Sequence, residues 1–307
     1  MSHATDTDNE LTYVLNKWRL SGAQTLAGGY QNKHWLVTAS GGTKLVLRRY
    51  KENHASDLPY EFEVMRLLAD RGLPVPRLVE EPMEHEGITW FLMTRMPGAE
   101  STTPLTNEQR RRGRLLAEFH ETSIELNTIG QRQGFQLPED WVNDEALVPQ
   151  LQRYESVRPE EGYALRWHLD LARELFAGLD FSSAGKLVLH GDFVGRNLLF
   201  KGEQLTGILD LESTHLSYRA TDFASAWRGC YDEVVHGYEE VHPLSELDRK
   251  LIVPSFWGLM FSGLKKELTA MDNAALSREN YAWHLKLLSR RSPLFGDLEN
   301  RKPNPIA

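Results

Sequence analysis

The chain changes its pattern of apolar residues at Pro97-Gly98, and this change limits the folds it can adopt. Before this dipeptide, short apolar segments are separated by turn-forming glycines, as in a β-sheet, with one helical segment at residues 58–71. After it, apolar residues recur mostly at helical spacing. A chain of 307 residues is long enough for two cores. We therefore expect an α+β protein with a small β-rich lobe over residues 1–97 and a larger, mainly helical lobe over residues 98–307.

The first lobe has three clear strand signals. Residues 34–39 and 44–50 flank a Ser-Gly-Gly turn and predict a hairpin, and residues 88–96 predict a further strand. Leu45, Val46 and Leu47 are consecutive and apolar, which favours a central strand buried on both faces.

The second lobe has helical spacing in five segments, with Pro254 expected to interrupt the fourth because proline removes a helical hydrogen bond. These helices are expected at residues 107–121, 141–152, 163–179, 244–268 and 276–290. One compact β segment is expected between them, at residues 186–189, 197–200 and 205–211.

Cysteine usage and hydropathy argue for a cytoplasmic protein without a membrane partner. The single cysteine, Cys230, excludes an internal disulfide, and no Cys/His cluster has zinc-like spacing. Residues 1–15 are polar and lack the apolar core of a signal peptide. The most apolar stretch, residues 252–264, is too short to span a bilayer.

The net charge of −8 is concentrated in the second lobe. Up to Pro97 there are 11 Lys and Arg against 12 Asp and Glu, and the remainder has 24 against 31. An acidic second lobe argues against a nucleic-acid partner, which would need a basic patch along the phosphate backbone. It is compatible with a cationic substrate, although solvated acidic helix faces account for most such imbalances.

Three polar residues stand at the ends of short apolar strands in the second lobe. Asp192 follows the strand at residues 187–189, Asn197 comes five residues later, and Asp210 ends the next hairpin. Phosphoryl transfer needs such a set, because one Asp can accept the proton of the attacking hydroxyl while an Asn and a second Asp bind magnesium. Turn chemistry explains each residue singly but not all three at this spacing.

These segments, Leu189-His190-Gly191-Asp192, Asn197-Leu198-Leu199 and Ile208-Leu209-Asp210, resemble the signature of the aminoglycoside phosphotransferase family. The resemblance implies a two-lobed protein-kinase-like fold, a nucleotide substrate (ATP or GTP) and Mg²⁺. It makes Asp192 the catalytic base and Asn197 and Asp210 the metal ligands.

The resemblance also implies residues that support the catalytic loop. It gives His190 and Asp222 this role, and Glu212 is a weaker candidate behind the metal site. Residues 116–120 resemble the family's helix that ends in Leu-His. Residues 217–219 read Ser-Tyr-Arg and depart from the family's usual Gly-Asp-Pro.

In the first lobe, the resemblance implies a set of residues that bind the nucleotide. Gly29 and Asn32 lie where the family places its phosphate-covering loop, and Thr94 and Met96 where the hinge would meet the adenine. Arg48 stands in place of the family's frequent strand lysine, and Glu61 is its expected partner. The nucleotide-binding candidates are thus Gly29, Asn32, Arg48, Glu61, Thr94 and Met96.

The leading function is a kinase that phosphorylates a hydroxyl of a small molecule such as an aminoglycoside-like antibiotic, an amino alcohol or a sugar. A protein kinase is less favoured, since Asp210-Leu211-Glu212 replaces Asp-Phe-Gly. The alternative from another class is a non-catalytic nucleotide-binding scaffold, suggested by Arg48 and by the altered residues 217–219. No sequence feature indicates an oligomeric state.

Overall fold

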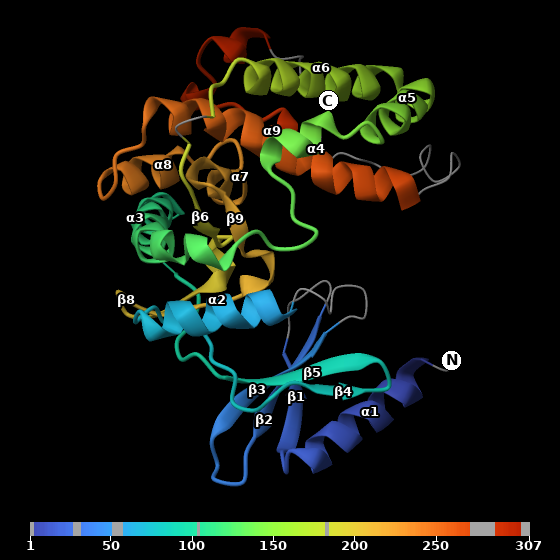
Figure 1. Cartoon of the computed structure of the whole chain (residues 1–307), viewed down its shortest axis with the longest axis vertical. Helices are drawn as coiled ribbons and strands as arrows, with labels where there is room; N and C mark the ends of the chain where they lie inside the picture. Colours follow the sequence, from blue (N-terminus) through green and yellow to red (C-terminus); the bar gives the residue numbers. More distant parts are fainter. Residues whose placement is uncertain are drawn as a thin grey trace. The chain divides into compact units, whose positions relative to one another are not determined.

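A computed structural model describes residues 3–26, 32–50, 58–102, 105–181, 184–270 and 286–301. The chain divides into two compact units (Figure 1). The first unit holds residues 1–100 and 197–212, and the second holds residues 101–196 and 213–307. The first contains a β-sheet and the second is mainly helical, which confirms the expected α+β class.

The first unit is built on a five-stranded antiparallel sheet with the strand order β1-β2-β3-β5-β4. β3 lies at its centre, as the three consecutive apolar residues predicted. The strands are β1 (Ser21–Thr25), β2 (Lys33–Thr38), β3 (Lys44–Tyr50), β4 (Met83–His85) and β5 (Ile88–Thr94).

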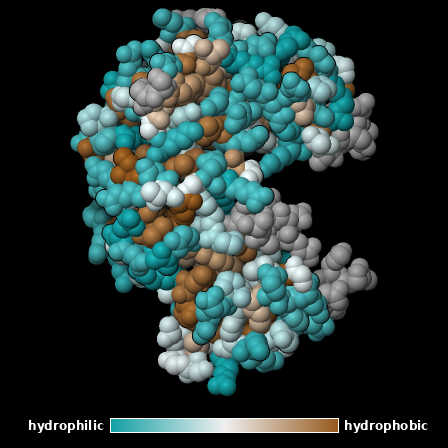
Figure 2. Space-filling view, in the orientation of Figure 1, coloured by the Kyte–Doolittle hydropathy of each residue, from teal (hydrophilic) through white to brown (hydrophobic). Residues whose placement is uncertain are grey.

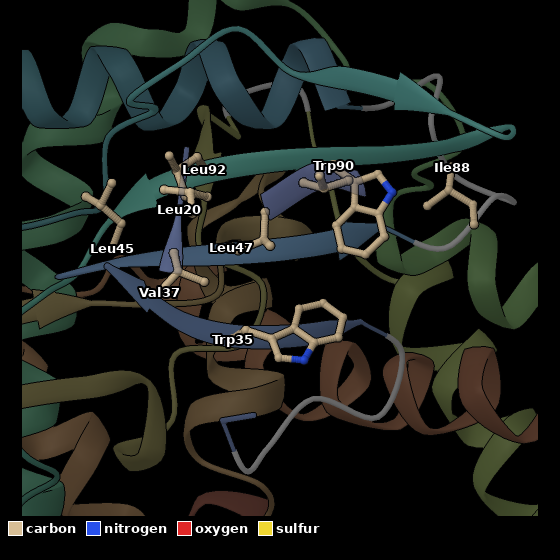
Figure 3. Packing of buried hydrophobic residues seen from close by; sticks show 9 residues of the cluster. Leu20, Trp35, Val37, Leu45, Leu47, Ile88, Trp90 and Leu92 are labelled. Atoms are coloured by element: carbon tan, nitrogen blue, oxygen red, sulfur yellow. The ribbon is translucent and has the colours of Figure 1, made fainter. Parts of the chain in front are cut away.

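One face of this sheet forms an apolar core with α1 (His3–Lys17) (Figure 3). Alternate residues of β2, β3 and β5 point to this face, and the indole rings of Trp35 and Trp90 stack with their centroids 5.6 Å apart. The sequence analysis did not predict α1, although Leu11, Val14, Leu15 and Trp18 follow helical spacing and lie in or against this core.

The other face carries side chains from α2 (Leu58–Asp70), which confirms the helix expected at residues 58–71. Phe62 of α2 packs edge-on against Phe91 of β5, with ring centroids 5.0 Å apart. Glu61, the preceding residue, is buried on the same helix. An α-helix over this face therefore places one carboxylate beside the central strands.

A hairpin that is distant in sequence completes the first unit. It consists of β7 (Leu198–Lys201) and β8 (Gln204–Ile208). Ile208 N–H donates to the Pro74 carbonyl at 2.7 Å, and the Thr206 hydroxyl donates to the Pro97 carbonyl at 2.6 Å. Gly98 has φ +109°, and a Cβ there would lie 2.6 Å from the Phe200 carbonyl oxygen. This close approach requires glycine in the dipeptide at which the sequence pattern changes.

The second unit packs helices around a small two-stranded sheet. β6 (Lys186–Leu189) pairs with β9 (His215–Tyr218), a strand that the sequence analysis missed. The α-helices are α3 (Leu105–Ser123), α4 (Pro138–Asn143), α5 (Leu147–Val157), α6 (Pro159–Ala177), α7 (Phe223–Ala226), α8 (Asp232–Glu239) and α9 (Glu246–Ala270). Short 3₁₀ turns are η2 (Ile124–Ile129), η3 (Gly195–Asn197), η4 (Leu211–Ser213), η5 (Arg219–Asp222) and η6 (Pro293–Arg301).

Three sequence expectations for these elements were wrong. Residues 141–152 do not form one helix, because α4 ends before the extended residue Asp144 and α5 begins at Leu147. α9 continues through Pro254, since buried neighbours such as Phe256 and Trp257 offset the lost hydrogen bond. The expected single β segment is two separate pairs, β6 with β9 and β7 with β8. Residues 276–285 of the last expected helix lie outside the described residues.

Apolar side chains are mainly interior. The face drawn in Figure 2 is largely hydrophilic, with scattered apolar residues. No helix among the described residues is long and apolar enough to cross a membrane.

α3 and α8 cross very closely because each contributes a glycine at the contact. A Cβ on Gly113 would lie 2.0 Å from the Val234 carbonyl oxygen, and one on Gly237 would lie 2.0 Å from that of Arg110. Backbone meets backbone at both points, so neither helix has room for a side chain. The crossing sets the spacing of the residues that these two helices direct toward the loop after β6.

We predict that Gly237→Ala destabilises the protein by about 1–3 kcal/mol, because the added methyl would force α3 and α8 apart. Helix propensity alone predicts the opposite, a gain of roughly 1 kcal/mol. Urea unfolding followed by circular dichroism measures the sign. Gly185→Ala is the control, since a Cβ at Gly185 meets no atom within 4 Å. A stabilised Gly237→Ala variant would contradict the close crossing.

Candidate active site

The loop that follows β6 is fixed through its backbone. His190 N–H and Gly191 N–H donate to the two oxygens of the Asp222 carboxylate at 2.9 and 2.7 Å. Gly191 has φ +81°, and a Cβ there would lie 2.3 Å from the Ser213 carbonyl oxygen. The loop therefore needs glycine at this position and an acceptor at residue 222.

Asp222 is fully buried and is held in turn by α3 and α8. Nε2 of His120 lies 2.9 Å from Oδ2 of Asp222, and Nδ1 of His120 lies 2.9 Å from the Tyr238 hydroxyl. Burial lowers the pKa of His120, so the ring is neutral. Since an ionised Asp222 only accepts, Nε2–H donates to Asp222 and the Tyr238 hydroxyl donates to Nδ1.

The surroundings of Asp222 favour its ionised form. Burial alone would raise its pKa, but the hydrogen bonds from His120 and Gly191 outweigh burial and lower it. Burial raises the pKa of Tyr238, so its hydroxyl keeps the proton that it donates. A buried carboxylate thus links two loop amides to two helices.

Asp192 differs from Asp222 because its side chain is 23% exposed. Its Oδ2 accepts a hydrogen bond from Nη2 of Arg196 at 2.7 Å. Its backbone N–H donates to Nδ1 of the buried His190 at 3.2 Å. The loop therefore combines a fixed backbone with a carboxylate that solvent, and hence a substrate, can reach.

The hairpin of the first unit carries Asn197 and Asp210 at the same end. Leu198 pairs with Ile208, and Leu209 N–H donates to the Asn197 carbonyl at 2.8 Å. Asp210, the next residue, adopts φ +64°, a left-handed conformation that Asp tolerates better than most residues. The turn after β8 thereby fixes the backbone position from which the Asp210 carboxylate extends.

The oxygen donors of Asn197 and Asp210 fit a magnesium ion that keeps phosphate and water ligands. Mg²⁺ is usually held in proteins by one or two carboxylates together with substrate phosphates. Across the described part of the chain, no group of three or more His, Cys, Asp and Glu residues is arranged to hold a metal. The donor set suits an ion that arrives with a nucleotide.

Arg48 of β3 lies buried among carboxylates of the first unit. Its Nη1 is 3.1 Å from Oε1 of Glu61, and its Nη2 pairs with Glu212. Asn32 donates to the same oxygen of Glu212 at 2.6 Å. Burial alone would lower the pKa of Arg48, but Glu61, Glu212 and Asp210 outweigh it and raise the pKa.

The structure thus brings three of the expected nucleotide-binding residues, Asn32, Arg48 and Glu61, into one network. The expected metal ligand Asp210 lies in electrostatic reach of Arg48. Thr94 and Met96 lie outside this network. The Thr94 N–H and hydroxyl both bond the backbone of Arg77 at 2.9 Å, and Met96 lies against Gly207 of β8. Gly29 lies outside the described residues.

Arg196 and Tyr238 were not predicted as site residues from the sequence. Arg196 could have been predicted from its position, because it stands four residues after Asp192. At this spacing a cation can reach a carboxylate across a turn. Tyr238 carries no such signal in the sequence, because its hydroxyl is distinguished only by the contact with His120 across the α3–α8 crossing.

A cavity of about 640 Å³ opens at the far end of β6 from the loop. Its lining includes Lys186, Tyr218, Arg219 and Asp248 but none of the expected site residues. We place the candidate active site at Asp192 and not in this cavity, because none of the residues expected to carry phosphoryl transfer lines the cavity.

We predict that Asp222→Asn lowers the free energy of unfolding by about 3–5 kcal/mol, because it breaks a buried charged network. The folded-state pKa of Asp222 is lowered, so its contribution is complete above the ordinary carboxyl value of about 4 and is lost as pH falls through the folded pKa. Urea unfolding of wild type and variant between about pH 3 and 7 checks both points. The exposed substitution Asp170→Asn is the control. A stability gap that does not narrow in acid would contradict the ionised network.

Comparison of the sequence with known proteins identifies a family and several relatives. The pattern of the phosphotransferase enzyme family (APH) matches residues 22–243. Homoserine kinase of Agrobacterium fabrum (strain C58 / ATCC 33970) is 26% identical over 269 residues, which cover 79% of each chain. Homoserine kinase of Phenylobacterium zucineum (strain HLK1) is 27% identical over 271 residues, again 79% of each chain.

Solved structures share the fold at lower identity. A thermostable mutant of aminoglycoside phosphotransferase APH(4)-Ia, in a ternary complex with ADP and hygromycin B, matches with a TM-score of 0.65 at 17% identity, over 90% of this chain and 95% of that one. Amicoumacin kinase hAmiN, in complex with AMP-PNP, Ca²⁺ and Ami, matches with a TM-score of 0.66 at 15% identity, over 100% and 98%. These likenesses confirm the expected two-lobed protein-kinase-like fold.

The family match covers more than half of the chain, and its members are enzymes, so the alternative of a non-catalytic scaffold is not retained. The chain therefore belongs to the phosphotransferase enzyme family (APH), and it is a nucleotide-binding small-molecule kinase.

Proposed function

We propose that the protein transfers the γ-phosphoryl group of ATP to a hydroxyl of a small molecule, with Asp192 as catalytic base. The observation that supports this best is the loop after β6. Two hydrogen bonds to Asp222 fix its backbone, yet the Asp192 carboxylate stays partly exposed. A general base needs a fixed position together with access to substrate.

Asp192 orients the acceptor hydroxyl and takes its proton. As the bond from the acceptor oxygen to the γ-phosphorus forms, the bond from that phosphorus to the β–γ bridging oxygen breaks and ADP leaves. Arg196 donates to Oδ2 of Asp192 and fixes the direction of the carboxylate. The products are the phosphorylated acceptor, ADP and a proton that Asp192 releases to solvent.

Asn197 and Asp210 are the proposed ligands of Mg²⁺, which would neutralise charge on the phosphates of ATP. We assign the contact with the nucleotide phosphates to Arg48, which Glu61 and Glu212 hold in place. Gly29 and Asn32 belong to the proposed phosphate-covering loop. Thr94 and Met96 take the hinge position beside the base of the nucleotide. GTP is the alternative to ATP as the nucleotide substrate.

The acceptor is a small molecule with a hydroxyl group. L-Homoserine leads the acceptors to be tested, because the relatives described above are named homoserine kinases. Hygromycin B and amicoumacin, bound by the structural neighbours, represent the antibiotic class. Amino alcohols and sugars complete the panel.

We predict that Asp192→Asn lowers acceptor-dependent turnover by about 10²- to 10⁴-fold, the usual contribution of a general base. Nucleotide binding in the presence of Mg²⁺ should change little, because the loop backbone is held by Asp222. Release of ADP and isothermal titration with a non-hydrolysable ATP analogue measure the two quantities. Asp170→Asn is the matched control on an exposed helix face. Undiminished turnover in Asp192→Asn would remove the proposed base.

Asp210→Asn should raise the Mg²⁺ concentration for half-maximal activity by roughly tenfold or more, since it removes one charged ligand. Glu203→Gln changes an exposed carboxylate at the tip of the same hairpin and should leave this concentration unchanged. Titration of activity with MgCl₂ at constant ATP gives the comparison. Equal curves for wild type and Asp210→Asn would show that Asp210 does not bind the metal.

A further inference from the structure

Four arginines of the second unit gather around Tyr231 and Asp192. The guanidinium groups of Arg112 and Arg290 lie over the Tyr231 ring, 5.7 and 5.5 Å from its centroid. Arg196 pairs with Asp192, and Arg228 lies in electrostatic reach of Asp192. We call Arg112, Arg196, Arg228 and Arg290 the arginine cluster.

The carboxylates beside this cluster already have partners. Glu108 pairs with Arg112 at 3.1 Å, and Asp192 pairs with Arg196 at 2.7 Å. Asp232 accepts hydrogen bonds from Nε1 of Trp227 and from the Ser292 hydroxyl, at 2.7 and 2.6 Å. Four guanidinium groups against three carboxylates leave a local charge of +1.

Arg228 is the member of the cluster that most lacks an anionic partner. Its Nε donates to the Ser225 carbonyl at 3.1 Å, and within the described ranges no carboxylate forms an ion pair with it. Burial lowers the pKa of its guanidinium, Asp192 opposes this effect, and Arg196 and Arg290 add to it. A half-buried cation among other cations is costly, and a bound anion relieves that cost.

The backbone holds Arg228 in a conformation that only surrounding structure maintains. Its φ is +52°, in the left-handed region that disfavours residues other than glycine. Nη1 of Arg290 donates to its carbonyl at 2.7 Å, and the next residue, Gly229, also has a positive φ. A Cβ on Gly229 would lie 2.8 Å from the Phe256 ring. The segment is therefore fixed before any substrate arrives.

We propose that Arg228, supported by the arginine cluster, binds an anionic group of the acceptor, a carboxylate, beside Asp192. The planar guanidinium fork matches a carboxylate, and the surrounding arginines favour negative charge. The substrate class is then hydroxyl-bearing carboxylic acids, including hydroxy-amino acids. This inference rests on the proposed function. It differs from the cationic acceptor with which the net charge is compatible, because the charge next to Asp192 is opposite in sign to that of the whole chain.

Matched acceptor pairs test the proposal through kinetics. Each pair has the same hydroxyl with and without a carboxylate: L-homoserine and 3-amino-1-propanol, L-serine and ethanolamine, glycerate and glycerol. Wild type should favour the carboxylate member, and Arg228→Gln should raise KM for that member by about 10- to 100-fold, as expected for a lost charged hydrogen bond. KM for ATP should stay the same. Arg228→Lys should recover part of the loss, and Arg249→Gln, an exposed arginine paired with Glu239, is the control.

Chemical labelling separates this proposal from the proposed function. L-Homoserine should protect Arg228 from phenylglyoxal, quantified by peptide mass spectrometry, whereas 3-amino-1-propanol should not. Protection by MgATP alone, with none from any carboxylate of the panel, would assign Arg228 to nucleotide phosphate and overturn the proposal.

Two further outcomes distinguish failure of this inference from failure of the proposed function. Phosphorylation of neutral or cationic acceptors with unchanged kinetics in Arg228→Gln would overturn this inference and leave the kinase intact. Carboxylate-specific protection without any phosphoryl transfer would support the anion site and count against the proposed function.

Discussion

The hydrogen bonds to the buried carboxylate of Asp222 are the interaction on which the loop after β6 depends. This carboxylate accepts hydrogen bonds from two consecutive loop amides and from His120, and His120 is joined to Tyr238. These contacts require α3 and α8 to lie at a fixed separation, which the glycines at their crossing permit. A buried charge would be costly without such partners, so the network and the helix packing stabilise each other. The position of Asp192 therefore depends on the packing of two helices that lie outside the loop.

The charged groups at the two candidate sites are arranged in opposite ways in the two units. In the first, a buried cation, Arg48, is surrounded by carboxylates, which stabilise its charge. In the second, Asp192 pairs with Arg196 and lies in electrostatic reach of Arg228, whose charge is not fully neutralised. In the first arrangement the cation already has two ion pairs, whereas the second favours an incoming anion. Net charge, which is −8 for the whole chain, predicts neither environment.

Sequence spacing predicted the parts of the structure that local chemistry determines. The strand-turn pattern located β3 and β5, and the spacing of Asp192, Asn197 and Asp210 picked out the loop and the end of the hairpin. What it missed depends on contacts distant in sequence. β9 pairs with β6 across almost thirty residues, and Glu212 meets Arg48 across 164. Pro254 was misjudged because burial of neighbouring side chains outweighs one hydrogen bond, a balance that only tertiary structure reveals.

The hairpin at residues 197–212 belongs by its contacts to the first unit, although almost a hundred residues of the second unit separate the two in sequence. As the chain leaves the ribosome, domains generally fold in order from the N-terminus. The sheet of the first unit can form early. The carbonyl groups of Pro74 and Pro97, however, receive their hydrogen bonds from the hairpin only after residue 208 has been synthesised. Nor does a contiguous fragment ending near residue 100 contain the proposed metal ligands. The order of synthesis therefore delays completion of the first unit until about half of the second has been synthesised.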